Sequence, residues 1–246
     1  MTPSVFSIVS TRNPACTEYY SQYEEVPSSN RYANRIRASL INCLKAFKQT
    51  TGSLPVKIII YRAGIADSEF ENVIEHEGNQ IKHALLSKDM CDSETTPYDE
   101  AYEPEYSYIV IRRNNRHRFY TKNPTKGDKL VNLPSGTVID HTVTTKNVFD
   151  FFIVPQESSR PTLCPLNCNI IANTCKLKPE QFQTLTYKLC HLYYNVPAAV
   201  PKPCVVQYAK KCAKMIGETK VLRRNRNCTD PTCQIPEAMR HTLYYL

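Results

Sequence analysis

Residues 57–64 read Lys-Ile-Ile-Ile-Tyr-Arg-Ala-Gly, which predicts a buried β-strand that ends in a sharp turn. Three consecutive β-branched residues, Ile58, Ile59 and Ile60, favour extended backbone and suit a strand covered on both faces. Gly64 interrupts the strand, and a helical pattern follows. In α/β proteins the chemistry gathers where such a strand ends. The residue at this point is Ala63, and its methyl group cannot bind a metal ion.

The segments before and after this strand predict further strands and helices. Residues 4–10 and 18–26 read as short strands, and apolar residues then recur at helical spacing from Ile36 to Phe47. Ser68 and Glu71 form a capping-box pattern that begins the next helix. A surface loop is expected at residues 88–106, and strands are expected at residues 106–112, 136–144 and 149–154. This order predicts an α/β fold, a mixed sheet with helices on both faces.

Two amphipathic helices are predicted in the last third of the chain. The first has an apolar stripe from Phe182 to Tyr193. The second turns apolar side chains such as Val206 and Ile216 inward, whereas three lysines face outward: Lys210, Lys211 and Lys214. The terminal Thr-Leu-Tyr-Tyr-Leu is apolar, so we expect it to dock on the protein.

Composition indicates a globular chain of 246 residues with 41% apolar residues. No apolar run approaches the roughly 20 residues that span a bilayer, and the N-terminus lacks the pattern of a signal peptide. These features predict a cytoplasmic or nuclear protein without a membrane partner. The eleven cysteines are then expected to be reduced and mostly buried. A zinc site is the alternative, but the spacings of Cys164, Cys168 and Cys175 and of Cys228 and Cys233 do not form matched pairs.

The net charge of +8 is concentrated in three stretches, at residues 112–118, 210–214 and 223–226. Clustered Lys and Arg neutralise phosphates, the interaction that dominates affinity for nucleic acids. A solvated helix face or loop is the alternative for any single stretch. Three such stretches together favour RNA.

Several segments together resemble the PIWI domain of Argonaute and Piwi proteins. They are residues 58–70, residues 136–156, the stretch Leu-Thr-Tyr-Lys-Leu-Cys-His within residues 177–195, Gln207-Tyr208-Ala209 and the terminal Tyr-Tyr-Leu. The stretch Leu-Thr-Tyr-Lys-Leu-Cys-His points to the Piwi branch. The resemblance implies an RNase H-like fold and one PIWI domain over residues 1–246 that is partial at its N-terminal side, with its first strand expected before Met1.

The resemblance also implies where catalytic groups would lie. Active members cut RNA with two divalent cations such as Mg2+, held by Asp, Glu, Asp and His. Ala63 stands at the second Asp and Lys210 at the His, the first Asp would precede Met1, and residues 30–32 offer no carboxylate. Asp67 and Asp140 are poor substitutes, and Glu24 belongs to the preceding strand. We therefore expect no catalytic residue, no metal, no cofactor and no enzymatic activity.

Binding groups of the family are better represented. The terminal carboxylate of Leu246 and Lys211 match groups near the guide 5′ phosphate, and Gln207 and Tyr208 lie on the same helix. Packing of Tyr208 and solvation of Lys211 are the alternatives. The sequence thus predicts a Piwi-like RNA-binding protein of the small-RNA, piRNA-type silencing pathway. Affinity for guide or target RNA should be weak, because the sequence has no room for MID and PAZ domains.

Two other functions stay open at this point. The first is a guide-directed endoribonuclease whose metal site is rebuilt from other groups. The second is a protein-interaction module of a silencing complex, because PIWI domains offer pockets that accept Trp side chains of partner proteins.

Overall fold

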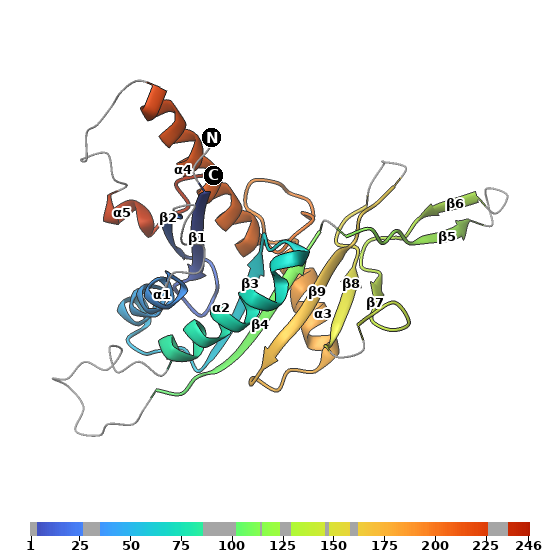
Figure 1. Ribbon diagram of the computed structural model, residues 1–246, viewed down its shortest axis with the longest axis horizontal. Helices are drawn as coiled ribbons and strands as arrows, with labels where there is room; N and C mark the ends of the chain where they lie inside the picture. The colour runs from blue at the N-terminus through green and yellow to red at the C-terminus, as the bar shows by residue number, and fades with distance from the viewer. Residues whose placement is uncertain are drawn as a thin grey trace. The chain divides into compact units, whose positions relative to one another are not determined.

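The structure is a computed structural model that describes residues 4–26, 35–85, 102–113, 115–123, 129–145, 148–157, 162–225 and 236–246. The chain divides into two compact units (Figure 1). Unit 1 comprises residues 1–57, 67–104 and 208–246, and unit 2 comprises residues 58–66 and 105–207. Within the described ranges, no helix has the length and apolar character that crossing a membrane requires.

Unit 2 contains a five-stranded sheet with the strand order β3-β4-β9-β8-β7. Its strands are β3 (Lys57–Ala63), β4 (Glu105–Arg112), β7 (Val138–Ile139), β8 (Asp150–Ile153) and β9 (Leu166–Asn173). The pairs β4–β9, β9–β8 and β8–β7 are antiparallel. A separate two-stranded sheet joins β5 (Tyr120–Asn123) to β6 (Lys129–Asn132).

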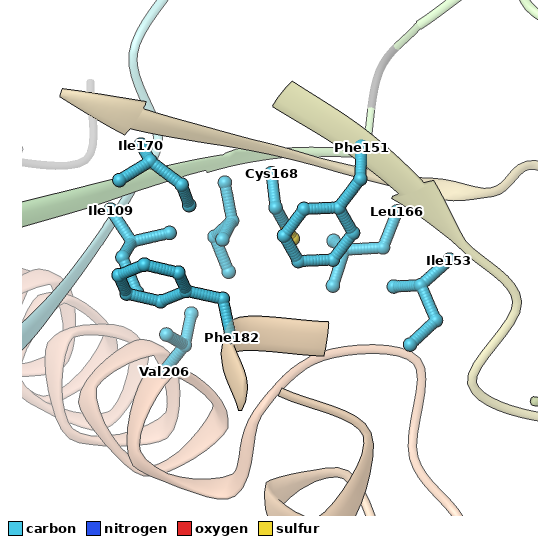
Figure 2. Packing of buried hydrophobic residues seen from close by; sticks show 9 residues of the cluster. Ile109, Phe151, Ile153, Leu166, Cys168, Ile170, Phe182 and Val206 are labelled. Carbon is cyan, nitrogen blue, oxygen red and sulfur yellow. The ribbon is translucent and has the colours of Figure 1, made fainter. Parts of the chain in front are cut away.

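One face of the five-stranded sheet carries the core of unit 2 (Figure 2). Side chains alternate along each strand, so Leu166 and Cys168 of β9 point to this face beside Phe151 of β8. Helix α3 (Pro179–Leu189) contributes Phe182, and the first turn of α4 (Cys204–Asn225) contributes Val206. Leu166, Cys168, Phe151 and Phe182 are each 1% exposed or less, so this cluster is closed to water.

Unit 1 is organised around the antiparallel pair of β1 (Ser4–Thr11) and β2 (Tyr19–Val26). One face packs Ile8 and Tyr20 against Cys43 and Ala46 of α1 (Arg35–Thr51). On α1, Ile36 N–H donates to Gln80 Oε1 of α2 (Phe70–Leu85) at 3.2 Å. A short 3-10 helix, η1 (Asp67–Glu69), precedes α2 where the capping-box pattern was recognised, and α5 (Glu237–Arg240) lies near the C-terminus.

Most predicted elements are confirmed, but two are shorter than expected. The strand predicted at residues 136–144 covers only Val138–Ile139. Thr142 has φ +68°, and the Val143 N–H donates to the His141 carbonyl at 2.8 Å, so the chain bends there. The helix predicted to reach Tyr193 ends at Leu189, because the Cys190 carbonyl accepts from Val200 N–H at 2.7 Å.

Some expectations lie partly or wholly outside the described residues. Of the surface loop predicted at residues 88–106, residues 88–101 are not described, and Glu105 and Tyr106 already belong to β4. Every cysteine in the described part of the chain is a free thiol, as predicted, whereas Cys91, Cys228 and Cys233 lie outside it. The predicted docking of the C-terminus is confirmed by Tyr245, which is 6% exposed.

Two leucines test the assignment of the core. Leu166→Ala should lower the free energy of unfolding by about 2–5 kcal/mol, because Leu166 is 1% exposed and the substitution leaves a cavity. Leu130→Ala is the matched control: this residue is 67% exposed, and its loss should cost no more than about 0.5 kcal/mol. Urea denaturation followed by circular dichroism measures both, and equal losses would contradict the core described above.

Two cysteines test the packing of α1 on β1 and β2. Burial raises the pKa of the Cys43 thiol to about 12, whereas Cys16 is exposed. The thiolate is the nucleophile, so at about pH 8 iodoacetamide should modify Cys16 and leave Cys43 intact. Mass spectrometry of the alkylated peptides measures this, with labelling in guanidinium chloride as the control that exposes both. Native labelling of Cys43 at the rate of Cys16 would show that this packing is wrong.

Candidate nucleic-acid interface

The end of β3 has the predicted strand-and-turn structure. Tyr61 is held by a 3.0 Å hydrogen bond between its hydroxyl and Thr186 Oγ1 of α3, and burial raises the pKa of this tyrosine. Gly64 has φ +85°, in the left-handed region that favours glycine. The Arg62 guanidinium donates to the Ala63 carbonyl, which fixes the turn further. These contacts fix the conformation of the turn, and the side chain at residue 63 within it is a methyl group.

The family's two-metal centre can be tested against these residues. Divalent cations that act on phosphodiesters need several carboxylate oxygens. Ala63 offers no oxygen and packs at the margin of the apolar cluster of unit 2, while Lys210 is exposed on α4 in unit 1. In the described part of the chain, no group of three or more His, Cys, Asp or Glu side chains could hold a metal ion. By resemblance these are two of the four ligand positions, and a methyl group and an ammonium group offer no ligand oxygen there.

The remaining acidic candidates have other contacts or lie outside the description. Glu24 belongs to β2, as predicted, and accepts from Ser39 Oγ at 3.3 Å. Asp140 follows β7 and accepts from Gln183 Nε2 at 2.9 Å. Residues 30–32 and the side chain of Asp67 lie outside the described structure.

Helix α4 presents the lysines as the sequence predicts. Lys210, Lys211 and Lys214 are exposed, whereas Cys212 and Ile216 between them are buried. Lys214 lies 3.6 Å from Glu218, an exposed pair that contributes little to stability. Within the described residues, neither Lys210 nor Lys211 pairs with an acidic side chain. Their two ammonium groups are thus available to a phosphate backbone.

The other predicted binding residues of α4 differ in exposure. Tyr208 is 0% exposed, and its ring packs edge-on against Tyr19 of β2 with centroids 5.0 Å apart. Ala209, next to it, accepts a hydrogen bond from Ser7 Oγ of β1 at 2.6 Å. Gln207 is half-buried. Tyr208 thus has the packing role that the sequence left as the alternative, and Lys211 is the exposed member of this set.

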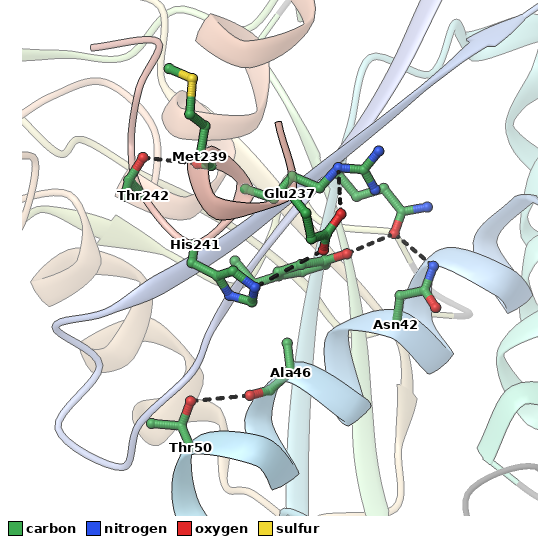
Figure 3. A network of polar contacts seen from close by, with 10 residues as sticks. Asn42, Ala46, Thr50, Glu237, Met239, His241 and Thr242 are labelled. Atoms are coloured by element: carbon green, nitrogen blue, oxygen red, sulfur yellow. Dashed lines mark hydrogen bonds and ion pairs between the residues drawn. The ribbon is translucent and has the colours of Figure 1, made fainter. Parts of the chain in front are cut away.

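The C-terminal segment docks on the elements of unit 1. The Tyr245 hydroxyl lies 2.9 Å from Ser21 Oγ of β2, and the Tyr244 hydroxyl lies 3.6 Å from Cys212 Sγ of α4. Figure 3 shows the preceding residues, where His241 Nε2 lies 4.0 Å from Glu237 Oε1. Leu246 itself is 37% exposed. The docked tyrosines therefore leave the terminal residue at the surface.

Unit 2 carries a second group of cations at residues 112–118. Arg112 Nη2 donates to Asn167 Oδ1 and Asn169 Oδ1, at 3.2 Å each, and Asn167 Nδ2 donates to Asp150 Oδ2 at 3.1 Å. Arg113 and Arg116 are exposed. The two asparagines that orient Arg112 were not recognised in the sequence, because the strand that holds them, β9, was not predicted. The alternation of Asn with apolar residues in Leu166–Asn173 was the available signal.

The comparisons with known proteins agree with this architecture. A family model described as Piwi domain matches residues 1–220. Piwi-like protein 1 of Danio rerio is 33% identical over 227 residues, 92% of this chain and 25% of that protein. The chain thus spans about a quarter of the length of this curated relative.

Two solved structures share the fold. Drosophila Piwi has a TM-score of 0.69 at 24% identity, over 99% of this chain and 32% of that one. Kluyveromyces polysporus Argonaute with a guide RNA has a TM-score of 0.79 at 19% identity, over 98% of this chain and 32% of that one. The predicted α/β, RNase H-like fold is confirmed, and with the family match over residues 1–220 the chain belongs to the Piwi domain family.

Proposed function

We propose that this chain is a Piwi-like RNA-binding protein of the small-RNA, piRNA-type silencing pathway and that it does not cleave RNA. One observation carries the proposal: α4 exposes Lys210 and Lys211 without acidic partners among the described residues, in a chain of net charge +8. The Kluyveromyces polysporus Argonaute, similar in fold, was solved with a guide RNA, which supports RNA as the ligand class.

The affinity arises mainly from charge. Two neighbouring ammonium groups on one helix neutralise phosphates without reading bases, so binding depends on the backbone and not on sequence. The buried side of α4, with Tyr208 and Cys212, holds the lysines on a rigid element. A small guide RNA or its target RNA would then bind weakly, and high salt would release either one.

The absence of cleavage follows from the residues that replace metal ligands. Two-metal hydrolysis needs negative charge that brings cations to the scissile phosphate. By resemblance, Ala63 removes one such charge and Lys210 adds a positive charge at the histidine position. Both changes disfavour divalent cations, whereas the lysine favours the phosphate itself. Binding and catalysis therefore separate in this chain.

A charge reversal on α4 tests the binding surface. Lys211→Glu should weaken binding of a fluorescein-labelled single-stranded RNA by about tenfold at low salt, because one attraction becomes a repulsion. Lys45→Glu is the matched control, since Lys45 is also exposed, lies on α1 of the same unit and changes the net charge equally. Fluorescence anisotropy gives both dissociation constants. Equal effects would mean that only net charge matters and would remove the surface from the proposal.

Reconstruction of two positions tests the lack of cleavage. The double variant Ala63→Asp with Lys210→His should still yield no product from a guide-complementary RNA in Mg2+ or Mn2+, because it adds a single carboxylate and two-metal cleavage needs several. A denaturing gel of end-labelled RNA detects cleavage, with an active Piwi protein as the positive control. A metal-dependent product from the wild-type chain would instead establish a rebuilt nuclease site.

A further inference from the structure

The hairpin of β5 and β6 forms an arm within unit 2. Its two strands pair with each other in a sheet of their own and extend beyond the edge of the five-stranded sheet (Figure 1). An isolated two-stranded ribbon is at best marginally stable in water. The arm therefore depends on how its base is attached.

Three contacts hold the base of the arm. The Phe119 ring packs edge-on against Phe152 of β8, with centroids 5.4 Å apart. Asn132 Oδ1 accepts from Leu163 N–H at 3.1 Å, and Asn115 Nδ2 donates to the Pro165 carbonyl at 2.8 Å. Both ends of the hairpin are thus fixed to the body of unit 2.

The register of the arm places an aromatic ring, a cation and an apolar side chain on one face. Tyr120 pairs with Asn132 and Lys122 pairs with Leu130, and side chains two residues apart share a face. Tyr120 is 41% exposed, Leu130 is 67% exposed, and Lys122 is exposed. The other face carries Lys129, which is also exposed.

The charge of this region indicates which class of macromolecule the face accepts. Residues 113–132 contain six Lys or Arg and one Asp, so a polyanion is favoured over a neutral or basic protein surface. Side chains two residues apart on a strand lie about 7 Å apart, which suits one base and the adjoining phosphate of an extended single strand. Proteins that bind single-stranded nucleic acids without sequence preference combine aromatic rings, which stack on bases, with cations, which neutralise phosphates.

We infer that the face formed by Tyr120, Lys122 and Leu130 binds single-stranded RNA. The Tyr120 ring stacks on a base, Lys122 neutralises the neighbouring phosphate, and Leu130 provides an apolar wall for the base. The inference rests on the proposed function, because it assigns this arm as a second contact for the same class of ligand. It adds a stacking contribution that lysines on α4 cannot supply.

The test compares variants that separate the two faces of the arm. Tyr120→Ala should weaken binding of a fluorescein-labelled oligouridine single strand by about tenfold, whereas Tyr120→Phe keeps the ring and should bind like wild type. Lys122→Gln should weaken binding several-fold. Lys129→Gln removes the same charge from the opposite face and should have a clearly smaller effect. Thermal denaturation of each variant confirms that the fold is retained.

The outcomes distinguish this inference from the proposed function. If Tyr120→Ala binds RNA with wild-type affinity, or if Lys122→Gln and Lys129→Gln lose equal affinity, the arm does not bind RNA as inferred. The proposal that α4 binds RNA would still stand. A loss for Tyr120→Ala that is as large with a fully paired duplex also overturns it, because paired bases cannot stack on the ring. A wild-type chain that binds no RNA would refute both proposals.

Discussion

The apolar face shared by β4, β8 and β9 is the constraint on which unit 2 depends. Phe182 of α3 and Val206 of α4 close over it and remove Ile109, Phe151 and Leu166 from water. Each such side chain contributes on the order of 1.5–3 kcal/mol when it is fully buried. Helix α3, once packed there, holds the end of β3 through the bond between Tyr61 and Thr186. The turn at Ala63 and the start of α4 are thus positioned by a single core.

Unit 1 uses the other part of α4 for two purposes at once. The helical period turns Tyr208 and Cys212 toward β2 and the C-terminal tyrosines, and the same period turns Lys210 and Lys211 to solvent. Packing on one side therefore fixes the orientation of the charges on the other. A surface held in this way binds phosphates with little loss of backbone entropy. The buried Tyr208 ring thus supports the proposed binding surface from inside the fold, without being exposed to a ligand itself.

Periodicity and turn residues were sufficient to predict β1–β4, α1, β8 and α4, because each has a clear repeat or a Gly or Pro boundary. β9 was missed although Asn and apolar residues alternate along it. The burial of Asn167 and Asn169 depends on their hydrogen bonds to Arg112 and Asp150, which are far away in sequence and which no local pattern encodes. The short strands β5 and β6 have no apolar alternation at all. For the candidate site, helical spacing was sufficient to predict that Lys210 and Lys211 face outward, and the resemblance supplied the binding role of Lys211. The burial of Tyr208 depends on Tyr19, a tertiary contact that no local pattern encodes.

The central claim is that this member of the Piwi domain family holds RNA through its phosphates. The dissociation constant of the wild-type chain for single-stranded RNA, measured across a series of salt concentrations, tests it most directly. Release of counterions predicts that the logarithm of the affinity falls linearly with the logarithm of the salt concentration, with a loss of about tenfold or more between low and physiological salt. A dissociation constant that does not change with salt would contradict the account.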